Sequence, residues 1–105
     1  MDDNNPFDHK AIDEVIHGRI RLGCAAYLST VQSALFNELR DKVGTTDGNL
    51  STHLRKLEEA GYVAIEKSFV NRKPQTRIAL TAAGRKAWLE WLERMRSIGE
   101  AAGGR

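Results

Sequence analysis

The chain has a single cysteine, Cys24, among its 105 residues. One cysteine excludes an internal disulfide framework and is typical of proteins in the reducing cytosol. No apolar run approaches the roughly 20 residues that a membrane-spanning helix needs, and the N-terminus lacks the basic and apolar regions of a signal peptide. We therefore expect a cytoplasmic protein without a membrane partner. The net charge is only +2, so it predicts no partner by itself.

Sequence motifs that accompany catalysis are also absent. The chain contains no nucleophile elbow, phosphate-binding loop, HExxH zinc motif or Cys–His pair at a recognisable spacing. His9, Asp13 and His17 follow one another at intervals of four residues, and on one side of a helix they could bind a metal ion. Polar residues beside an apolar stripe are far more often simply solvated. We therefore expect no enzymatic activity, no metal and no other cofactor.

The charged residues are unevenly distributed along the chain. Residues 1–39 carry three Lys/Arg against six Asp/Glu, residues 40–86 carry ten against five, and residues 87–105 carry three of each. Positive charge is thus concentrated in the middle segment, which favours a polyanionic partner there. The composition suits one globular domain, predicted over residues 8–98, with 1–7 and 99–105 as flexible termini.

The positive segment contains a predicted helix over residues 47–60 with clear start and stop signals. Thr46 can cap its N-terminus, and Gly61 can end it in the left-handed conformation. One face is polar and cationic at its N-terminal end. The other face is a narrow apolar stripe at helical spacing, formed by Leu50, Leu54 and Leu57. By itself, this pattern fits a DNA-binding helix and an ordinary surface helix equally well.

The spacing of apolar residues and turn formers predicts the other elements. They are helices over about 8–17, 18–28, 36–43 and 82–98, a very short strand at 34–35, and strands over 63–69 and 76–80. The helices over 36–43 and 47–60 are joined by a glycine-containing turn, as in a helix-turn-helix. The two longer strands form a hairpin whose basic connection contains the turn formers Asn71 and Pro74. The predicted fold is mainly α with a small β-hairpin.

Five stretches of the chain form a combined pattern. They are HGRIRL (17–22), FNEL (36–39), TDGNLSTHLRKLEEAGYV (46–63), the basic hairpin tip, and RIALTAAGR (77–85). Together they resemble the winged helix-turn-helix domain of small MarR-like and ArsR-like transcriptional regulators of bacteria and archaea. The resemblance implies a sequence-specific regulator, a homodimeric repressor that places two copies of the 47–60 helix in successive major grooves of a near-palindromic operator.

The chain departs from both families in ways that affect ligand binding. MarR proteins have longer flanking helices, whereas this chain has one helix after the hairpin, which argues against a ligand pocket of their kind. ArsR metal sensors often cluster cysteines in or near the DNA-binding helices. The single cysteine here lies elsewhere, which argues against that metal site.

The resemblance also assigns candidate DNA-binding residues. Arginine forms a bidentate pair with guanine and asparagine forms one with adenine, so Asn49, Ser51, Thr52 and Arg55 are candidates for base contacts. His53 is predicted to pack beside the leucine stripe instead. Lysines and arginines that contact phosphates set affinity and salt dependence. The full set is Thr46, Gly48, Asn49, Ser51, Thr52, Arg55 and Lys56 on the helix, with Lys67, Arg72, Lys73 and Arg77 on the wing.

The predicted C-terminal helix carries two tryptophans, Trp88 and Trp91. They could complete the core of one subunit, or form a dimer interface with Leu92, Met95 and Ile98. Because two DNA half-sites imply two subunits, we favour the interface. The predicted partners are therefore double-stranded DNA and a second copy of the chain, and a small-molecule effector is left open.

An alternative function is a winged-helix adaptor that binds proteins and not DNA, because this fold serves both purposes. Adaptors tend to lose lysine and arginine from the helix and the wing, whereas this chain has both. The charge on these two elements therefore favours DNA binding.

Overall fold

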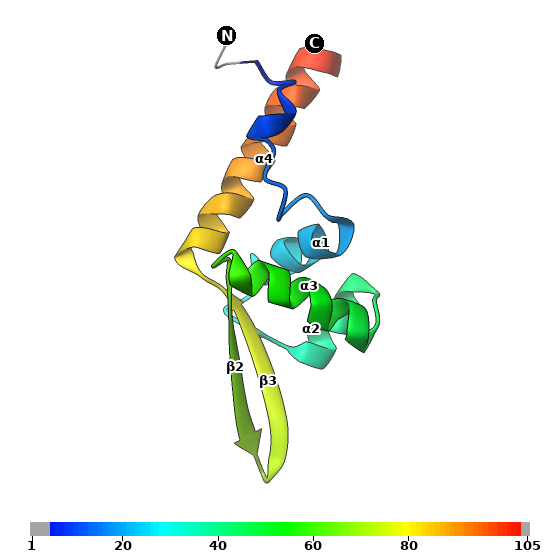
Figure 1. Cartoon of the computed structure of the whole chain (residues 1–105), viewed down its shortest axis with the longest axis vertical. Helices are drawn as coiled ribbons and strands as arrows, with labels where there is room; N and C mark the ends of the chain where they lie inside the picture. Colours follow the sequence, from blue (N-terminus) through cyan, green and yellow to red (C-terminus); the bar gives the residue numbers. More distant parts are fainter. Residues whose placement is uncertain (1–4, 104–105) are drawn as a thin grey trace.

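The structure, a computed structural model, describes residues 5–103. A short 3-10 turn (His9–Ala11) precedes seven further elements. They are α1 (Arg19–Leu28), β1 (Ala34–Leu35), α2 (Phe36–Val43), α3 (Asp47–Glu59), β2 (Val63–Val70), β3 (Lys73–Leu80) and α4 (Ala82–Gly103). Figure 1 shows α1, α2 and α3 grouped at the centre, with the β2–β3 hairpin and α4 projecting in opposite directions. The molecule is consequently elongated, with extents of 56 × 23 × 22 Å.

The three strands form one antiparallel sheet in the order β1-β3-β2. Ala34 pairs with Ile78 at the inner end of β3, and Val63 pairs with Leu80. The outer half of the hairpin has no third strand beside it, so it forms a two-stranded wing. The predicted fold class, a mainly helical domain with a winged helix-turn-helix, is confirmed.

One apolar core joins the helices to the sheet. It contains the predicted stripe of α3 together with residues of α1, α2 and all three strands: Cys24, Leu28, Ala34, Leu39, Leu50, Leu54, Leu57, Val63 and Ile78. Burying a side chain of leucine size stabilises the fold by roughly 1.5–3 kcal/mol. Burial raises the pKa of the Cys24 thiol to about 12, so this cysteine is a protonated, small apolar core residue. Across residues 5–103, every helix is too short or too polar to cross a membrane.

The helix predicted over residues 8–17 is wrong. Only a 3-10 turn forms there, because aspartate side chains bind nearby backbone N–H groups and compete with helical hydrogen bonds. The Asp13 carboxylate accepts from the N–H groups of Val15 and Ile16 at 2.8 and 3.0 Å. Its second oxygen accepts from the Tyr62 hydroxyl at 2.5 Å. His9, Asp13 and His17 therefore share no helix face, and within residues 5–103 no three metal-binding side chains come together.

Two other predicted boundaries also change. The predicted C-terminal tail is instead helical as far as Gly103, five residues beyond Ile98. Arg96 supports this extension, because its guanidinium pairs with Glu93 one turn before it and with Glu100 one turn after it. Residues 1–4 and 104–105, predicted to be flexible, lie outside the described residues.

The wing is longer than predicted. Its connection is two residues and not six, and Pro74 lies within β3, paired with Phe69. Proline lacks a backbone donor, so it is tolerated where a strand has a free edge. β1 pairs only with Ile78 and Arg77, which leaves that edge of β3 free at Pro74.

Candidate nucleic-acid interface

The start and end of α3 are set by local backbone chemistry. Gly44 ends α2 in the left-handed conformation, with φ of 77°, and the chain turns directly into α3. The Thr46 hydroxyl accepts from the N–H of Asn49 at 3.2 Å, which satisfies one free donor at the helix N-terminus. After the helix, Gly61 is also left-handed, with φ of 80°. These features confirm the predicted cap, turn and stop, and they hold α3 across α2 as a helix-turn-helix.

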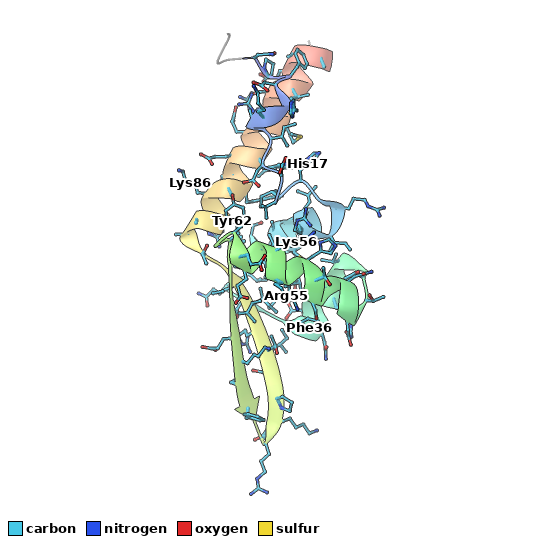
Figure 2. All side chains as sticks on the ribbon, viewed as in Figure 1. His17, Phe36, Arg55, Lys56, Tyr62 and Lys86 are labelled. Atoms are coloured by element: carbon cyan, nitrogen blue, oxygen red, sulfur yellow. The ribbon has the colours of Figure 1, made fainter. Side chains whose placement is uncertain are left out.

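The face of α3 opposite the leucine stripe is open to solvent. All of the predicted DNA-binding residues on this helix are exposed, including Gly48, Asn49 and Ser51. Figure 2 shows Arg55 and Lys56 extending from the helix. In the described part of the chain, neither of them has a carboxylate within 4.0 Å. Both cations are therefore available to an external anion.

The wing turns through Asn71 and Arg72, which both have positive φ, at 53° and 68°. This is the pattern of a type I′ hairpin turn, in which glycine is preferred at the second position. Asparagine tolerates the left-handed conformation, whereas an arginine there is strained by about 1 kcal/mol. Strained residues are concentrated at functional sites, so Arg72 stays a candidate for DNA contact.

Replacing Arg72 with glycine should therefore stabilise the domain and weaken DNA binding. Relief of the strain predicts a gain of roughly 0.5–1 kcal/mol in the free energy of unfolding. Loss of the charge predicts lower affinity and a less steep salt dependence. Arg72→Lys is the matched control, because it retains both the strain and the charge. Denaturant titration and fluorescence anisotropy measure the two effects, and a Gly variant with unchanged stability would show that the turn is not strained.

Two other cations of the wing, Lys67 and Arg77, lie on opposite faces of the hairpin. Lys67 lies on the side facing α3, where it lines a groove with Ser51, Arg55 and Glu58. Glu58 was not predicted as part of this surface, and its negative charge reduces the positive potential at the base of the groove. Arg77 lies on the opposite face, where it donates to the Ser33 hydroxyl at 3.0 Å.

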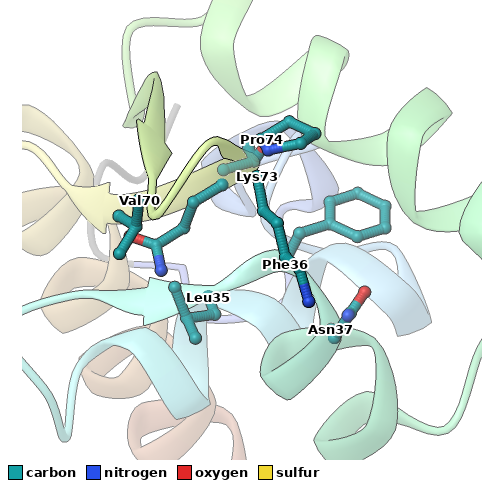
Figure 3. Close-up of a pocket in the computed structure, with 8 residues that line it drawn as sticks. Leu35, Phe36, Asn37, Val70, Lys73 and Pro74 are labelled. Carbon is teal, nitrogen blue, oxygen red and sulfur yellow. The ribbon is translucent and has the colours of Figure 1, made fainter.

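A second groove lies between the wing and the beginning of α2. Figure 3 shows Lys73 and Pro74 on the wing side, and Phe36 and Asn37 on the α2 side. Lys73 is exposed, and it brings a positive charge to the rim of this groove. Two grooves with basic rims therefore lie along the wing, one beside α3 at its inner half and one beside α2 that extends to its outer half.

The helix-turn-helix, the exposed polar face of α3 and the basic wing identify the family. A family model described as winged helix DNA-binding domain matches residues 20–98. The chain belongs to the winged helix DNA-binding domain family. An uncharacterized protein of Methanocaldococcus jannaschii is 35% identical over 79 residues, which are 75% of this chain and 86% of the relative.

Solved structures have the same winged helix fold. A transcriptional regulator homologue from Pyrococcus horikoshii OT3 matches with a TM-score of 0.81 at 25% identity, over 87% of this chain and 90% of that one. The M. tuberculosis transcriptional regulator MOSR in complex with DNA matches with a TM-score of 0.69 at 21% identity, over 91% and 71% of the two chains. MarR family regulators are also among the structural neighbours. The predicted resemblance to small regulators of this kind is confirmed.

Arg40 is a residue of this winged helix surface that the sequence did not reveal. Its guanidinium lies 2.7 Å from the Asp47 carboxylate and 2.9 Å from that of Asp41. The hydrogen bonds to Asp47 and Asp41 raise the pKa of Arg40 above its ordinary value. The ion pair offsets the negative charge of Asp47 at the start of α3, which would otherwise repel a DNA phosphate. Because Arg40 lies on α2 and Asp47 on α3, no local sequence pattern predicts this ion pair.

His53 packs on the inner side of α3, as predicted, and it has a specific partner. Its Nδ1 atom lies 2.9 Å from the guanidinium of Arg21. Arg21 is held in turn by the carbonyl oxygen of Val15, to which its Nε donates at 2.6 Å. Arginine can only donate, so Nδ1 of His53 accepts and the imidazole is neutral. Burial, the Arg21 charge and the Lys56 charge lower the pKa of His53.

Acidification should therefore destabilise the winged helix domain through His53. The pKa of His53 in the folded state lies below its unfolded value of about 6.5, so the unfolded chain binds more protons below that pH. Its stabilising effect is complete above pH 6.5 and is lost as the pH falls toward the folded-state pKa. Denaturation midpoints at pH 7.5 and 5.5 measure this loss. His53→Gln is the control, since glutamine can accept from Arg21 without titrating; an equal loss in this variant would exclude His53 as the cause.

The two tryptophans of α4 pack mainly on their own chain. Their rings stack with centroids 5.7 Å apart, and they lie against a small cluster of Ile16, Ala25 and Ala87. The indole N–H of Trp91 donates to His17 at 3.0 Å. The predicted interface residues that remain half-buried are Trp88, Trp91, Met95 and Ile98, whereas Leu92 is 41% exposed. The dimer interface stays a prediction.

Proposed function

We propose that this winged helix protein is a homodimeric repressor that binds a near-palindromic operator. In this proposal α3 enters the major groove with its N-terminal half, where Asn49, Ser51, Thr52 and Arg55 contact base edges. The wing contacts the backbone or the flanking minor groove. Occupation of the operator blocks access of the transcription machinery.

The observation that carries the proposal is the exposed, unpaired cationic face of α3 beside a basic wing. Arg55 and Lys67 line the same groove from α3 and from the wing, so DNA that enters it meets positive charge from two sides, only partly offset by Glu58 at its base. Thr52 retains acceptor capacity while its hydroxyl donates to the Gly48 carbonyl at 3.1 Å. MOSR has the same fold and its structure is a complex with DNA, which supports DNA as the partner.

Dimerisation is proposed through α4. This helix of 22 residues extends about 33 Å at 1.5 Å per residue, and it projects beyond the three-helix core (Figure 1). Leu89 and Leu92 are 57% and 41% exposed, and their spacing of three places them on one side of the helix. A second copy of α4 packed against this side would bury both leucines and set the distance between the two copies of α3.

Selection of bound duplexes from a random library tests the proposal. The expected result is a palindrome whose half-sites are separated by about one helical turn, 10–10.5 base pairs. An unpaired half-site would contradict the dimer, and failure to retain any duplex at low salt would contradict DNA binding and favour a protein partner. Repression is tested with a reporter whose promoter contains the recovered site.

A further inference from the structure

The outer wing has one face that continues the face packed on the core. In an antiparallel hairpin the two side chains of a cross-strand pair lie on the same face, and successive pairs alternate. The pairs Val63–Leu80 and Ile65–Ile78 contribute to the core. The next pair on this face, Lys67–Thr76, lines the groove beside α3. The last pair on the same face is Phe69–Pro74.

Phe69 and Pro74 form an apolar pair at the far end of this face. Phe69 is 76% exposed, more than any other large apolar side chain in the described residues, and Pro74 is also exposed. Water around an aromatic ring is unfavourable, and nothing in the fold requires phenylalanine at this position. An apolar ring so far from the core therefore indicates contact with a partner.

The charges around the pair indicate what that partner is. Residues 67–76 contain three Lys/Arg and no Asp/Glu. One of the three is Arg72, held in a left-handed conformation at the tip. A partner that covers Phe69 must therefore be anionic around an apolar centre. The minor groove of DNA has this chemistry, because phosphates line its rims while sugars and stacked bases form its walls and floor.

We propose that Phe69, supported by Pro74, is an apolar wedge that enters the minor groove and partly unstacks one base step. This inference rests on the proposed DNA-binding function and makes it more specific. The wedge would kink the duplex toward the major groove, and the widened minor groove would admit the tip of the wing. Because pyrimidine–purine steps such as TA and CA/TG unstack most easily, Phe69 becomes a specificity-determining residue outside the half-sites that α3 contacts.

The test compares wild type with Phe69→Ala on the duplex recovered by selection, carrying a fluorophore at each end. Wild type should bend the duplex, which brings the two ends closer and raises energy transfer. The variant should leave it nearly straight and bind about tenfold more weakly, as expected when one aromatic–base contact is lost. Repeating the selection with the variant should remove the preference for TA or CA/TG steps under the wing, while the half-site preference is retained.

Two control variants separate the wedge from a general effect of losing an exposed apolar side chain. Phe7→Ala removes an aromatic ring that is 59% exposed and lies outside the wing, and it should leave bending and affinity unchanged. Phe69→Leu retains an apolar wedge and should preserve most of the bend. Both Phe69 variants should fold, since the side chain lies outside the core, and circular dichroism checks this.

The outcomes distinguish the wedge from the wider proposal. If wild type binds its site and Phe69→Ala bends the same duplex with equal affinity, the wedge is wrong and the repressor proposal stands. If Phe69→Ala changes only the sedimentation of the free protein, the ring contacts a second copy and the wedge is again wrong. If wild type retains no duplex at low salt, the repressor proposal fails and the wedge fails with it.

Discussion

Replacing Arg55 with alanine should weaken binding to the operator by roughly 10- to 100-fold, because a bidentate contact to guanine contributes about 1–3 kcal/mol of discrimination. Arg55 is exposed on the polar face of α3 and faces the groove shared with the wing. Affinity for unrelated duplexes should fall much less, since non-specific binding depends on phosphate contacts. Fluorescence anisotropy with the selected duplex and a scrambled one measures both changes.

Two lysine variants distinguish a base contact by Arg55 from a general effect of positive charge. Lys56→Ala removes a charge assigned to phosphate contact, so it should weaken both duplexes alike and lower the salt slope by about 1. Lys86→Ala removes the same charge from α4, where the side chain is 78% exposed, and it should change affinity by no more than about twofold. Figure 2 shows Lys86 on a different element from Arg55. Equal losses for Arg55→Ala and Lys86→Ala would mean that only total charge matters.

Replacing Gly84 with alanine should destabilise the domain by about 3 kcal/mol or more, because overpacking that forces the backbone to move exceeds the usual range. Gly84 is buried in the first turn of α4, and an added Cβ would lie 2.0 Å from the carbonyl oxygen of Tyr62. That oxygen already accepts from the N–H of Thr81 at 3.0 Å. Thermal unfolding should show a fall in Tm of at least about 10 °C for a domain of this size.

Gly99 provides the matched control in the same helix. An added Cβ there meets nothing within 4 Å, so Gly99→Ala should stabilise the domain by up to about 1 kcal/mol through helix propensity. Opposite signs for the same substitution in one helix would show that the contact with Tyr62, and not propensity, determines the residue at Gly84. A Gly84→Ala variant as stable as wild type would refute this close approach.

The elements that the sequence predicted well are those set by residues a few positions apart. The cap at Thr46 and the stop at Gly61 each involve only adjacent turns of chain. The failed helix over residues 8–17 also has a partly local cause, since Asp13 binds the N–H groups of Val15 and Ile16. The apolar residues of this segment do pack against the core, as Val15 and Ile16 show, but they do so from an irregular segment and not from a helix.

The predicted wing was too short because the sequence contains two possible turn positions. Asn71 and Pro74 are both turn formers, and the sequence alone does not say which of them the turn uses. The antiparallel register resolves this, because pairing continues to Val70 and Lys73. Only the two residues between them are left for the turn, and Pro74 becomes part of the exposed apolar pair.

The sequence by itself determined that this protein has a helix with a cationic polar face, a glycine turn before it and a basic hairpin after it. Periodicity, capping and turn chemistry act over a few residues, so they can be recognised in the sequence alone. Only the tertiary structure decided which hairpin face meets α3, why Gly84 must be glycine, and that Trp91 binds His17. The last contact joins residues 74 positions apart; such pairings depend on how the elements pack, and no local pattern encodes them.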